Sequence, residues 1–178
     1  LLMDCDLRNP SVQKLAGRPV QAGLTEYLAG AAKPGQIVTA LGKDKPDVIF
    51  AGRHAGTQTE SLGSEAFRAL MNTMRETYDF IVLDTPPCSL MTDAMEAGAA
   101  ADCALLVVRQ DFSSRASVVN SLAALDEYGV PVLGYALNAC RRSGRSGYGY
   151  GYGYGYGYGY GYGYGYGYGE RRGKNGAD

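Results

Sequence analysis

The stretch D-F-I-V-L-D-T-P-P, residues 79–87, joins a short apolar run to an aspartate and a pair of prolines. Four to eight apolar or β-branched residues bounded by turn signals are typical of a buried strand. We therefore predict a strand over residues 79–83, covered on both faces as in a parallel sheet, with Asp84 at its carboxyl end. The two prolines end the strand because they cannot donate to a ladder.

On either side of this stretch, apolar runs alternate with helical patterns. Further strands are predicted over residues 1–5, 48–51, 103–108 and 132–137. Helices are predicted over residues 24–28, 64–78, 93–100 and 114–128. Strands separated by helices of this length indicate a doubly wound, mostly parallel α/β sheet. Residues 1–142 are the right size for one such domain.

Carboxylates follow two of the predicted strands. Asp4 and Asp6 lie in L-M-D-C-D-L-R-N-P, residues 2–10, and Asp84 follows the strand of residues 79–83. In an extended segment Asp4 and Asp6 project from the same side, and ligands of open α/β sheets bind beyond the carboxyl ends of strands. Clustered carboxylates repel one another unless a cation lies between them, which favours Mg²⁺ together with nucleotide phosphates. Taken singly, each motif is more often a turn, a helix cap or a strand terminator, and their joint occurrence carries the prediction.

Composition excludes several other kinds of site. The four cysteines have no C-x-x-C spacing and His54 is the single histidine, so zinc sites and Cys/His or Ser/His/Asp catalysis are poorly supported. A net charge of −1 gives no basic field for nucleic acid, although basic residues flank the tail. No apolar run reaches the roughly 18 residues of a membrane span. Three of the four cysteines lie in or beside apolar, strand-like segments, where small buried thiols are common, so a reducing cytoplasm is the simplest setting.

Residues 143–178 form a tail of a different kind. Within it, eleven tyrosines alternate with glycines: Tyr148, Tyr150, Tyr152, Tyr154, Tyr156, Tyr158, Tyr160, Tyr162, Tyr164, Tyr166 and Tyr168. Glycine at every second position carries a large ordering entropy, so we predict a disordered tail with accessible phenol rings. Such a tail is either a phosphorylation substrate or a cohesive tract that self-associates through aromatic contacts.

These motifs together resemble the bacterial tyrosine kinases of capsule and exopolysaccharide biosynthesis. Residues 1–10 resemble the Walker A-prime motif of that family, and residues 80–87 resemble its Walker B motif. Residues 92–94 match the stretch after Walker B, and residues 23–30 (G-L-T-E-Y-L-A-G) resemble a further family segment. The resemblance covers residues 1 to about 140 and implies a P-loop NTPase-like fold of the deviant type.

The resemblance also implies roles for individual residues. Asp4 is the candidate base or orienting group for an incoming tyrosine hydroxyl, while Asp6 and Asp84 would hold Mg²⁺, largely through its waters. Arg8 would act near the phosphates of ATP or pair with a local carboxylate. Asn138 would contact adenine or form a strand-end turn. The eleven tail tyrosines would be sites of autophosphorylation in trans, which implies a homo-oligomer.

One expected element is missing from the sequence. No G-x-x-x-x-G-K-[ST] phosphate cradle occurs, and the chain opens at Leu1 in what looks like the middle of a strand. We therefore expect a fragment that lacks the first strand, the Walker A loop and the first helix, and that is inactive alone. The resemblance implies a cytoplasmic position at the inner face of the plasma membrane. Implied partners are a membrane chain-length regulator, fused upstream or separate, and a cognate tyrosine phosphatase.

Two other function classes remain open. A partitioning or septum-positioning ATPase would use the same sheet and carboxylates with water as the acceptor, but it gives no role to the tyrosine tail. A non-catalytic scaffold for a self-associating Gly-Tyr tract would suit the missing cradle, but it makes Asp4, Asp6 and Asp84 coincidental.

Overall fold

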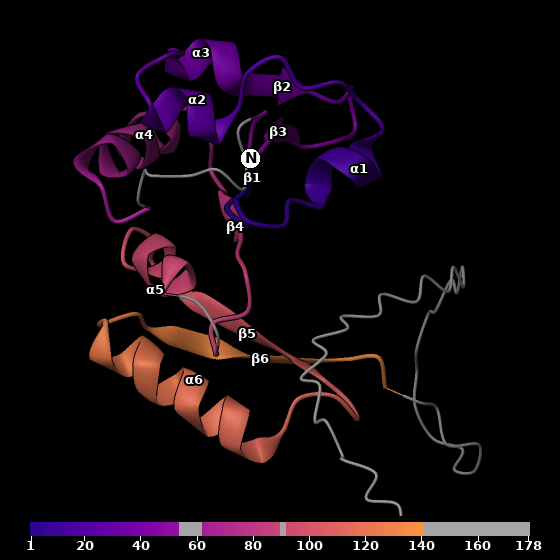
Figure 1. Cartoon of the computed structure of the whole chain (residues 1–178), viewed down its shortest axis with the longest axis vertical. Helices are drawn as coiled ribbons and strands as arrows, with labels where there is room; N and C mark the ends of the chain where they lie inside the picture. The colour runs from indigo at the N-terminus through magenta and orange to yellow at the C-terminus, as the bar shows by residue number, and fades with distance from the viewer. Residues whose placement is uncertain (54–61, 90–91, 141–178) are drawn as a thin grey trace, which may run out of the picture. The chain divides into compact units, whose positions relative to one another are not determined.

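The computed structural model describes residues 1–53, 62–89 and 92–140, all within one compact unit, Leu1–Arg141 (Figure 1). Residues 141–178, which include the tail, lie outside the described residues. The prediction of tail disorder and the eleven tyrosines therefore stay sequence-based.

The described part alternates strands and helices, as an α/β fold requires. Its strands are β1 (Leu2–Asp4), β2 (Val38–Ala40), β3 (Asp47–Ile49), β4 (Val82–Asp84), β5 (Ala104–Arg109) and β6 (Val132–Asn138). Its helices are α1 (Val12–Ala16), α2 (Leu24–Leu28), α3 (Pro34–Ile37), α4 (Glu65–Arg75), α5 (Asp93–Gly98) and α6 (Arg115–Glu127). The predicted strands and helices are all present, with shifted ends, while α1, α3 and β2 were not predicted.

The strands form two sheets. The first has the order β2-β3-β1-β4, in which β1 is parallel to both β3 and β4, and β2 is antiparallel to β3. The second pairs β5 with β6 in parallel. The mostly parallel α/β prediction is confirmed, and within the described part of the chain the strands are divided between these two sheets.

Helix α4 shows how the sequence builds the larger core. Ser64 caps its start by accepting a hydrogen bond from the Phe67 backbone N–H at 3.3 Å. Its buried residues Phe67, Leu70, Met71 and Met74 recur at helical spacing and pack against the four-stranded sheet with Met3 and Ile49. The pattern predicted from residues 64–78 thus gives one buried stripe.

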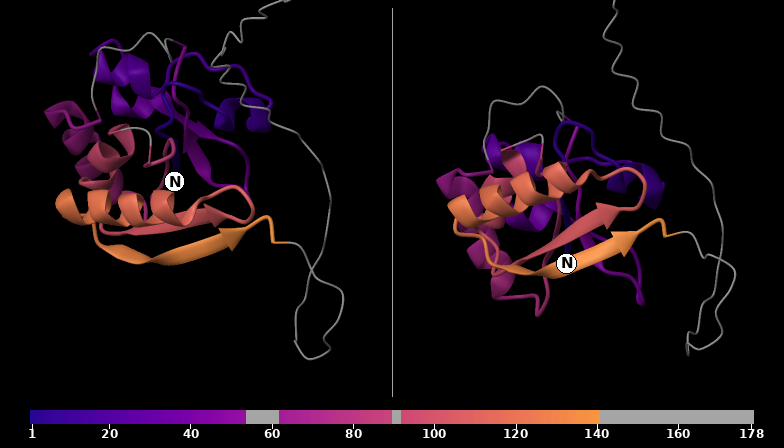
Figure 2. Two further views of the ribbon diagram at one scale, coloured as in Figure 1. Left: turned by 60° about the horizontal axis from the view of Figure 1, so that its bottom comes forward. Right: turned by 90° about the horizontal axis from the view of Figure 1, so that it is seen from below.

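The second sheet carries its own helix and a smaller core. α6 begins after Ser114, whose hydroxyl accepts from the Ser117 N–H at 3.1 Å, and it runs alongside β5 and β6 (Figure 2). Leu125 and Val130 pack there against Met95 of α5. Helix α5 therefore contacts the core of the second sheet, while its Ala97 lies in the core of the first.

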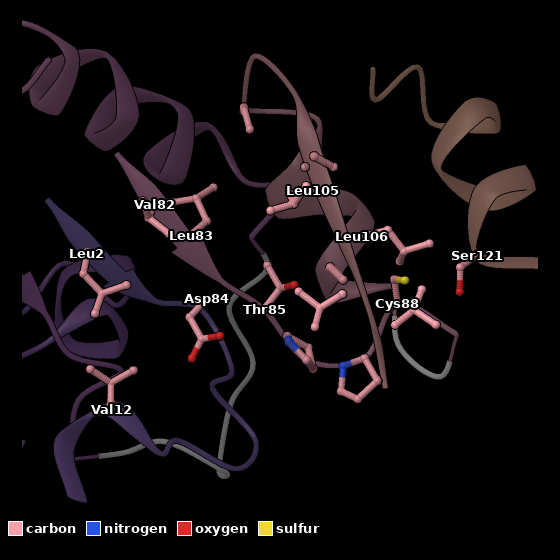
Figure 3. A pocket seen from close by; sticks show the side chains of 18 of the residues that line it. Leu2, Val12, Val82, Leu83, Asp84, Thr85, Cys88, Leu105, Leu106 and Ser121 are labelled. Atoms are coloured by element: carbon pink, nitrogen blue, oxygen red, sulfur yellow. The ribbon is translucent and has the colours of Figure 1, made fainter. Parts of the chain in front are cut away.

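An apolar cavity of about 1340 Å³ separates β4 from β5 (Figure 3). Val82 and Leu83 line one side of it, and Leu105, Leu106 and Val107 line the other. Val82 is 59 % exposed, so the prediction that this strand is buried on both faces was wrong. Val82 is exposed because, within the described residues, no strand pairs with the cavity side of β4.

Candidate functional site

The two predicted aspartate motifs meet at the carboxyl ends of neighbouring strands. β1 and β4 pair in parallel with Asp4 directly opposite Asp84, and the Cys5 N–H donates to the Asp84 carbonyl at 2.7 Å. Parallel strands end at the same edge of a sheet, so this pairing sets both side chains at one edge. The predicted convergence of the motifs is present in the structure.

Asp4 is fully buried, which is unusual for a carboxylate. Its Oδ2 accepts from the Val12 N–H at 3.2 Å, and its Oδ1 accepts from the Asp6 N–H at 3.3 Å. Burial raises the pKa of Asp4 to about 6; the Val12 donor lowers it, and the charges of Asp84 and Asp6 raise it. A group with a pKa near the working pH is suited to accept a proton.

Asp6 and Asp84 complete the carboxylate cluster, which we define as Asp4, Asp6 and Asp84. β1 ends at Asp4, so Asp6 lies in the following loop, where its Oδ1 accepts from the Asn9 N–H at 2.9 Å. Asp84 is exposed to solvent beside the cavity. Its pKa is raised chiefly by partial burial and, to a smaller extent, by the charge of Asp6.

Arg8 pairs with a carboxylate that sequence reasoning did not single out. Its Nε donates to Oδ2 of Asp93 at 2.7 Å, and its Nη2 donates to Oδ1 at 3.4 Å. The pair raises the pKa of Arg8, and Asp6 contributes to the same shift. Arg8 thus pairs with a carboxylate 85 residues away in the chain and not with a local one, and its charge also interacts with that of Asp6 in the carboxylate cluster.

Asn138 ends β6, as predicted, in the second sheet. Its Oδ1 accepts from the Ala139 N–H at 2.7 Å, and Ala139 has a left-handed φ of 56°. This contact is that of a strand-end turn. The contact with adenine stays a prediction.

Glu26 is a second buried carboxylate that the sequence did not reveal. Its Oε2 accepts from the Gly23 N–H at 2.7 Å and its Oε1 from the Arg53 N–H at 3.0 Å. Burial raises the pKa of Glu26, but these backbone donors outweigh it and leave the pKa below its ordinary value. Glu26 thereby fastens the start of α2 to the chain that follows β3. A capping-box reading of G-x-x-E at residues 23–26 could have found it.

The donor set of the carboxylate cluster suits a magnesium ion. In residues 1–53, 62–89 and 92–140 no three or more His, Cys, Asp or Glu side chains form a ready metal cage. Mg²⁺ keeps several waters and binds through one or two carboxylates plus substrate phosphates, so it does not need such a cage. Asp6 and Asp84, whose charges act on each other, fit this mode.

The fold and this edge of the sheet define the class of protein. The septum site-determining protein MinD from Pyrococcus horikoshii, solved with Mg-ADP, superposes with a TM-score of 0.66 at 24 % identity, over 82 % of this chain and 58 % of that chain. This likeness is one of fold alone, and it places the chain in the class of α/β domains with a mostly parallel sheet.

The family is narrower than that class. The chain is 30 % identical to the kinase domain of VpsO, with a TM-score of 0.72 over 79 % of this chain and 70 % of that chain. It is 33 % identical over 148 residues to the tyrosine-protein kinase etk of Escherichia coli strain K12, a match that covers 83 % of this chain. The chain belongs to the bacterial tyrosine-protein kinases.

Three further findings bound this assignment. The match spans 20 % of the length of etk and 60 % of the length of the putative tyrosine-protein kinase CapB of Staphylococcus aureus. No protein-family model matches the sequence. None of the helices that the structure describes is both long enough and apolar enough to cross a membrane.

Proposed function

We propose that this chain is part of an ATP-dependent protein-tyrosine autokinase that phosphorylates its own Gly-Tyr tail in trans. The observation that carries the proposal is the meeting of Asp4 and Asp84 on paired parallel strands, with Asp6 and Arg8 acting on the same cluster. Phosphoryl transfer requires mainly positioning and charge stabilisation, which such a cluster supplies. The tail supplies acceptor hydroxyls in the same polypeptide.

In this proposal each residue has a separate task. Asp4 orients the incoming tyrosine hydroxyl and accepts its proton, a role favoured by its raised pKa of about 6. Asp6 and Asp84 would hold Mg²⁺ through its waters, and the ion when bound neutralises charge on the phosphates of ATP. Arg8 stabilises phosphate charge from the edge of the cluster, and Asn138 contacts adenine from the second sheet.

We propose that in the intact kinase a further parallel strand lies in the cavity between β4 and β5. This strand would lead into a phosphate-binding loop. Both bordering strands are unpaired on that side within the described residues, and Leu105 and Val107 are 57 % and 60 % exposed there. An apolar strand in this position would satisfy two rows of backbone groups and cover these side chains. The loop would then begin next to Asp84, at the edge where the other strands end.

Residues 1–178 alone are expected to bind Mg-ATP with a dissociation constant of about 1 mM or weaker. Several charge-assisted hydrogen bonds from a phosphate cradle are missing, and the step from micromolar to millimolar affinity needs only about 4 kcal/mol. Isothermal titration calorimetry checks this, with Mg-GTP as the control for general phosphate binding. Micromolar binding of Mg-ATP by residues 1–178 would contradict the proposal that a further strand and its phosphate-binding loop belong between β4 and β5.

The tail acts as an adjustable charge in this proposal. Its 23 residues, 147–169, span roughly 26 Å as a glycine-rich coil, enough to reach the site of a neighbouring copy. Each phosphate adds about −1.5 to −2 charges, so complete modification adds roughly −16 to −22. We propose that this repulsion loosens the homo-oligomer.

Replacing all eleven tail tyrosines with phenylalanine is expected to abolish the change in oligomer size that follows incubation of the intact kinase with Mg-ATP. Light scattering before and after incubation measures the change, and mass spectrometry counts the phosphates. The variant keeps aromatic contacts, so a purely cohesive tract would behave as the parent does. An unchanged shift in the variant would rule out the tail as its cause.

The remaining partners follow from the family. We propose a membrane chain-length regulator, fused or separate, that recruits the kinase to the inner face of the plasma membrane, and a tyrosine phosphatase that resets the tail. Exopolysaccharide export would be the regulated process. The MinD-like fold keeps an ATPase with water as acceptor as the second candidate, and phosphotyrosine in the tail separates the two.

A further inference from the structure

Arg8 and Asp93 form a two-point contact between parts of the chain that are far apart in sequence. Arg8 follows β1 in the loop that also carries Asp6, and Asp93 is the first residue of α5. The bonds from Nε at 2.7 Å and from Nη2 at 3.4 Å engage one edge of the guanidinium. A bidentate pair fixes orientation as well as distance, which a single contact does not.

The two partners differ in how firmly they are held. The Asp93 side chain is 21 % exposed, and its helix is anchored by Met95 and Ala97, which belong to the cores of the two sheets. The Arg8 side chain is 58 % exposed on a loop. Free arginine side chains lose about 2 kcal/mol of rotamer entropy when they are ordered. Asp93 therefore supplies the fixed point, and Arg8 is the group that is oriented.

The pair leaves donors of Arg8 for another ligand. A guanidinium has five N–H donors, and Asp93 uses two of them. The charge of Asp6 also acts on Arg8, which places the guanidinium in the electrostatic reach of the carboxylate cluster. The Arg8 guanidinium is positively charged, is held by Asp93 along one edge and is otherwise open to solvent. It is therefore suited to bind an anionic oxygen that is accompanied by a cation.

We propose that Asp93 is a positioning residue for phosphoryl transfer: it holds the Arg8 guanidinium so that its remaining N–H groups stabilise the transferred phosphoryl group. The inference rests on the proposed kinase function and adds to it a residue on α5. Pre-organised donors act where charge develops and need no reorganisation during the reaction. Without Asp93, Arg8 keeps its charge but loses its orientation.

The intact kinase with Asp93→Asn tests this directly. We expect kcat for tail phosphorylation to fall about tenfold while KM for Mg-ATP stays within about twofold, because the lost contact acts chiefly in the transition state. Initial rates over a range of Mg-ATP concentrations give both constants. Melting temperatures of the same preparations, without nucleotide, report the structural effect.

Two further variants distinguish a positioning role of Asp93 from a purely structural one. The matched control is Asp102→Asn, which breaks the ion pair of Arg75 Nη2 with Asp102 Oδ1 at 3.1 Å, a link between α4 and the chain before β5. We expect it to leave kcat within about twofold of the parent. The exchange R8D/D93R restores an ion pair but moves the guanidinium to α5. We expect it to recover the melting temperature lost in Asp93→Asn and not to recover kcat.

The possible outcomes are distinct. An unchanged kcat in Asp93→Asn would overturn the inference, as would an exchange variant that recovers kcat together with the melting temperature. A parent kinase that transfers no phosphate to tyrosine would instead refute the proposed function, and the inference with it.

Discussion

Replacing Asp4 with asparagine is expected to lower tyrosine phosphorylation by the intact kinase by about 10² to 10⁴-fold, the usual contribution of a positioned general base. The amide keeps one oxygen that accepts from the Val12 N–H, so the loop after β1 retains its main contact. It cannot take the proton of the incoming hydroxyl. Rates of phosphotyrosine formation measure the loss, and activity within tenfold of the parent would show that Asp4 is not the base.

The same substitution is expected to stabilise residues 1–178 at neutral pH. Folding raises the pKa of Asp4 from 3.8 to about 6, so between these values the folded state binds more protons than the unfolded state. Stability therefore falls as the pH rises from about 4 to about 6, and the cost stays constant above that range. At 1.36 kcal/mol per pKa unit the full cost is about 3 kcal/mol.

Urea denaturation from pH 4 to pH 8 in magnesium-free buffer checks this. The parent should lose stability across the window, and Asp4→Asn should lose much less of it and be the more stable of the two at pH 7.5. Asp79→Asn, at an exposed aspartate, is the control that should keep the parental profile. A parent whose stability rises with pH through this window would contradict the raised pKa.

Replacing Gly52 with alanine is expected to destabilise the domain by about 3 kcal/mol or more. Gly52 follows β3 with a φ of +114°, a conformation that side-chain-bearing residues rarely adopt. A Cβ there would also collide with Thr25 Oγ1 and Glu26 Oε2. Both atoms belong to the buried start of α2, so neither can move aside without breaking the bonds of Glu26.

Urea denaturation at pH 7.5 measures the effect, with Gly35→Ala as the matched control. A Cβ at Gly35 meets nothing within 4 Å, and the residue lies in helix α3. Alanine there should leave stability unchanged or raise it by up to about 1 kcal/mol. Equal midpoints for the two variants would show that the packing of α2 against the end of β3 is looser than the structure indicates.

The sequence predicted the individual helices and strands better than it predicted which neighbours cover them. Phe67, Leu70, Met71 and Met74 set the buried face of α4 through their spacing, which needs no knowledge of the rest of the chain. Val82 was wrongly predicted to be buried, because hydrophobicity states what a side chain favours and not whether a neighbour covers it. Strand β2, Val38–Ala40, was not predicted.

The site was predictable to a similar extent. Asp4 and Asp84 could be brought together because parallel strands end at one edge of a sheet. The partner of Arg8 could not be found, since Asp93 is 85 residues away and only the packing of α5 brings it near. The burial of Asp4 also depends on Val12 of α1, a five-residue helix with too short a pattern to predict.

Helix α5 has a consequence for how the domain unfolds. Met95 and Ala97 are two residues apart, yet one packs with Leu125 and Val130 and the other with the core of the four-stranded sheet. Fraying of this single short helix removes a contact from both cores at once. The two sheets are therefore coupled into one cooperative unit, in which hydrogen-exchange protection of β1 and of β5 should rise and fall together.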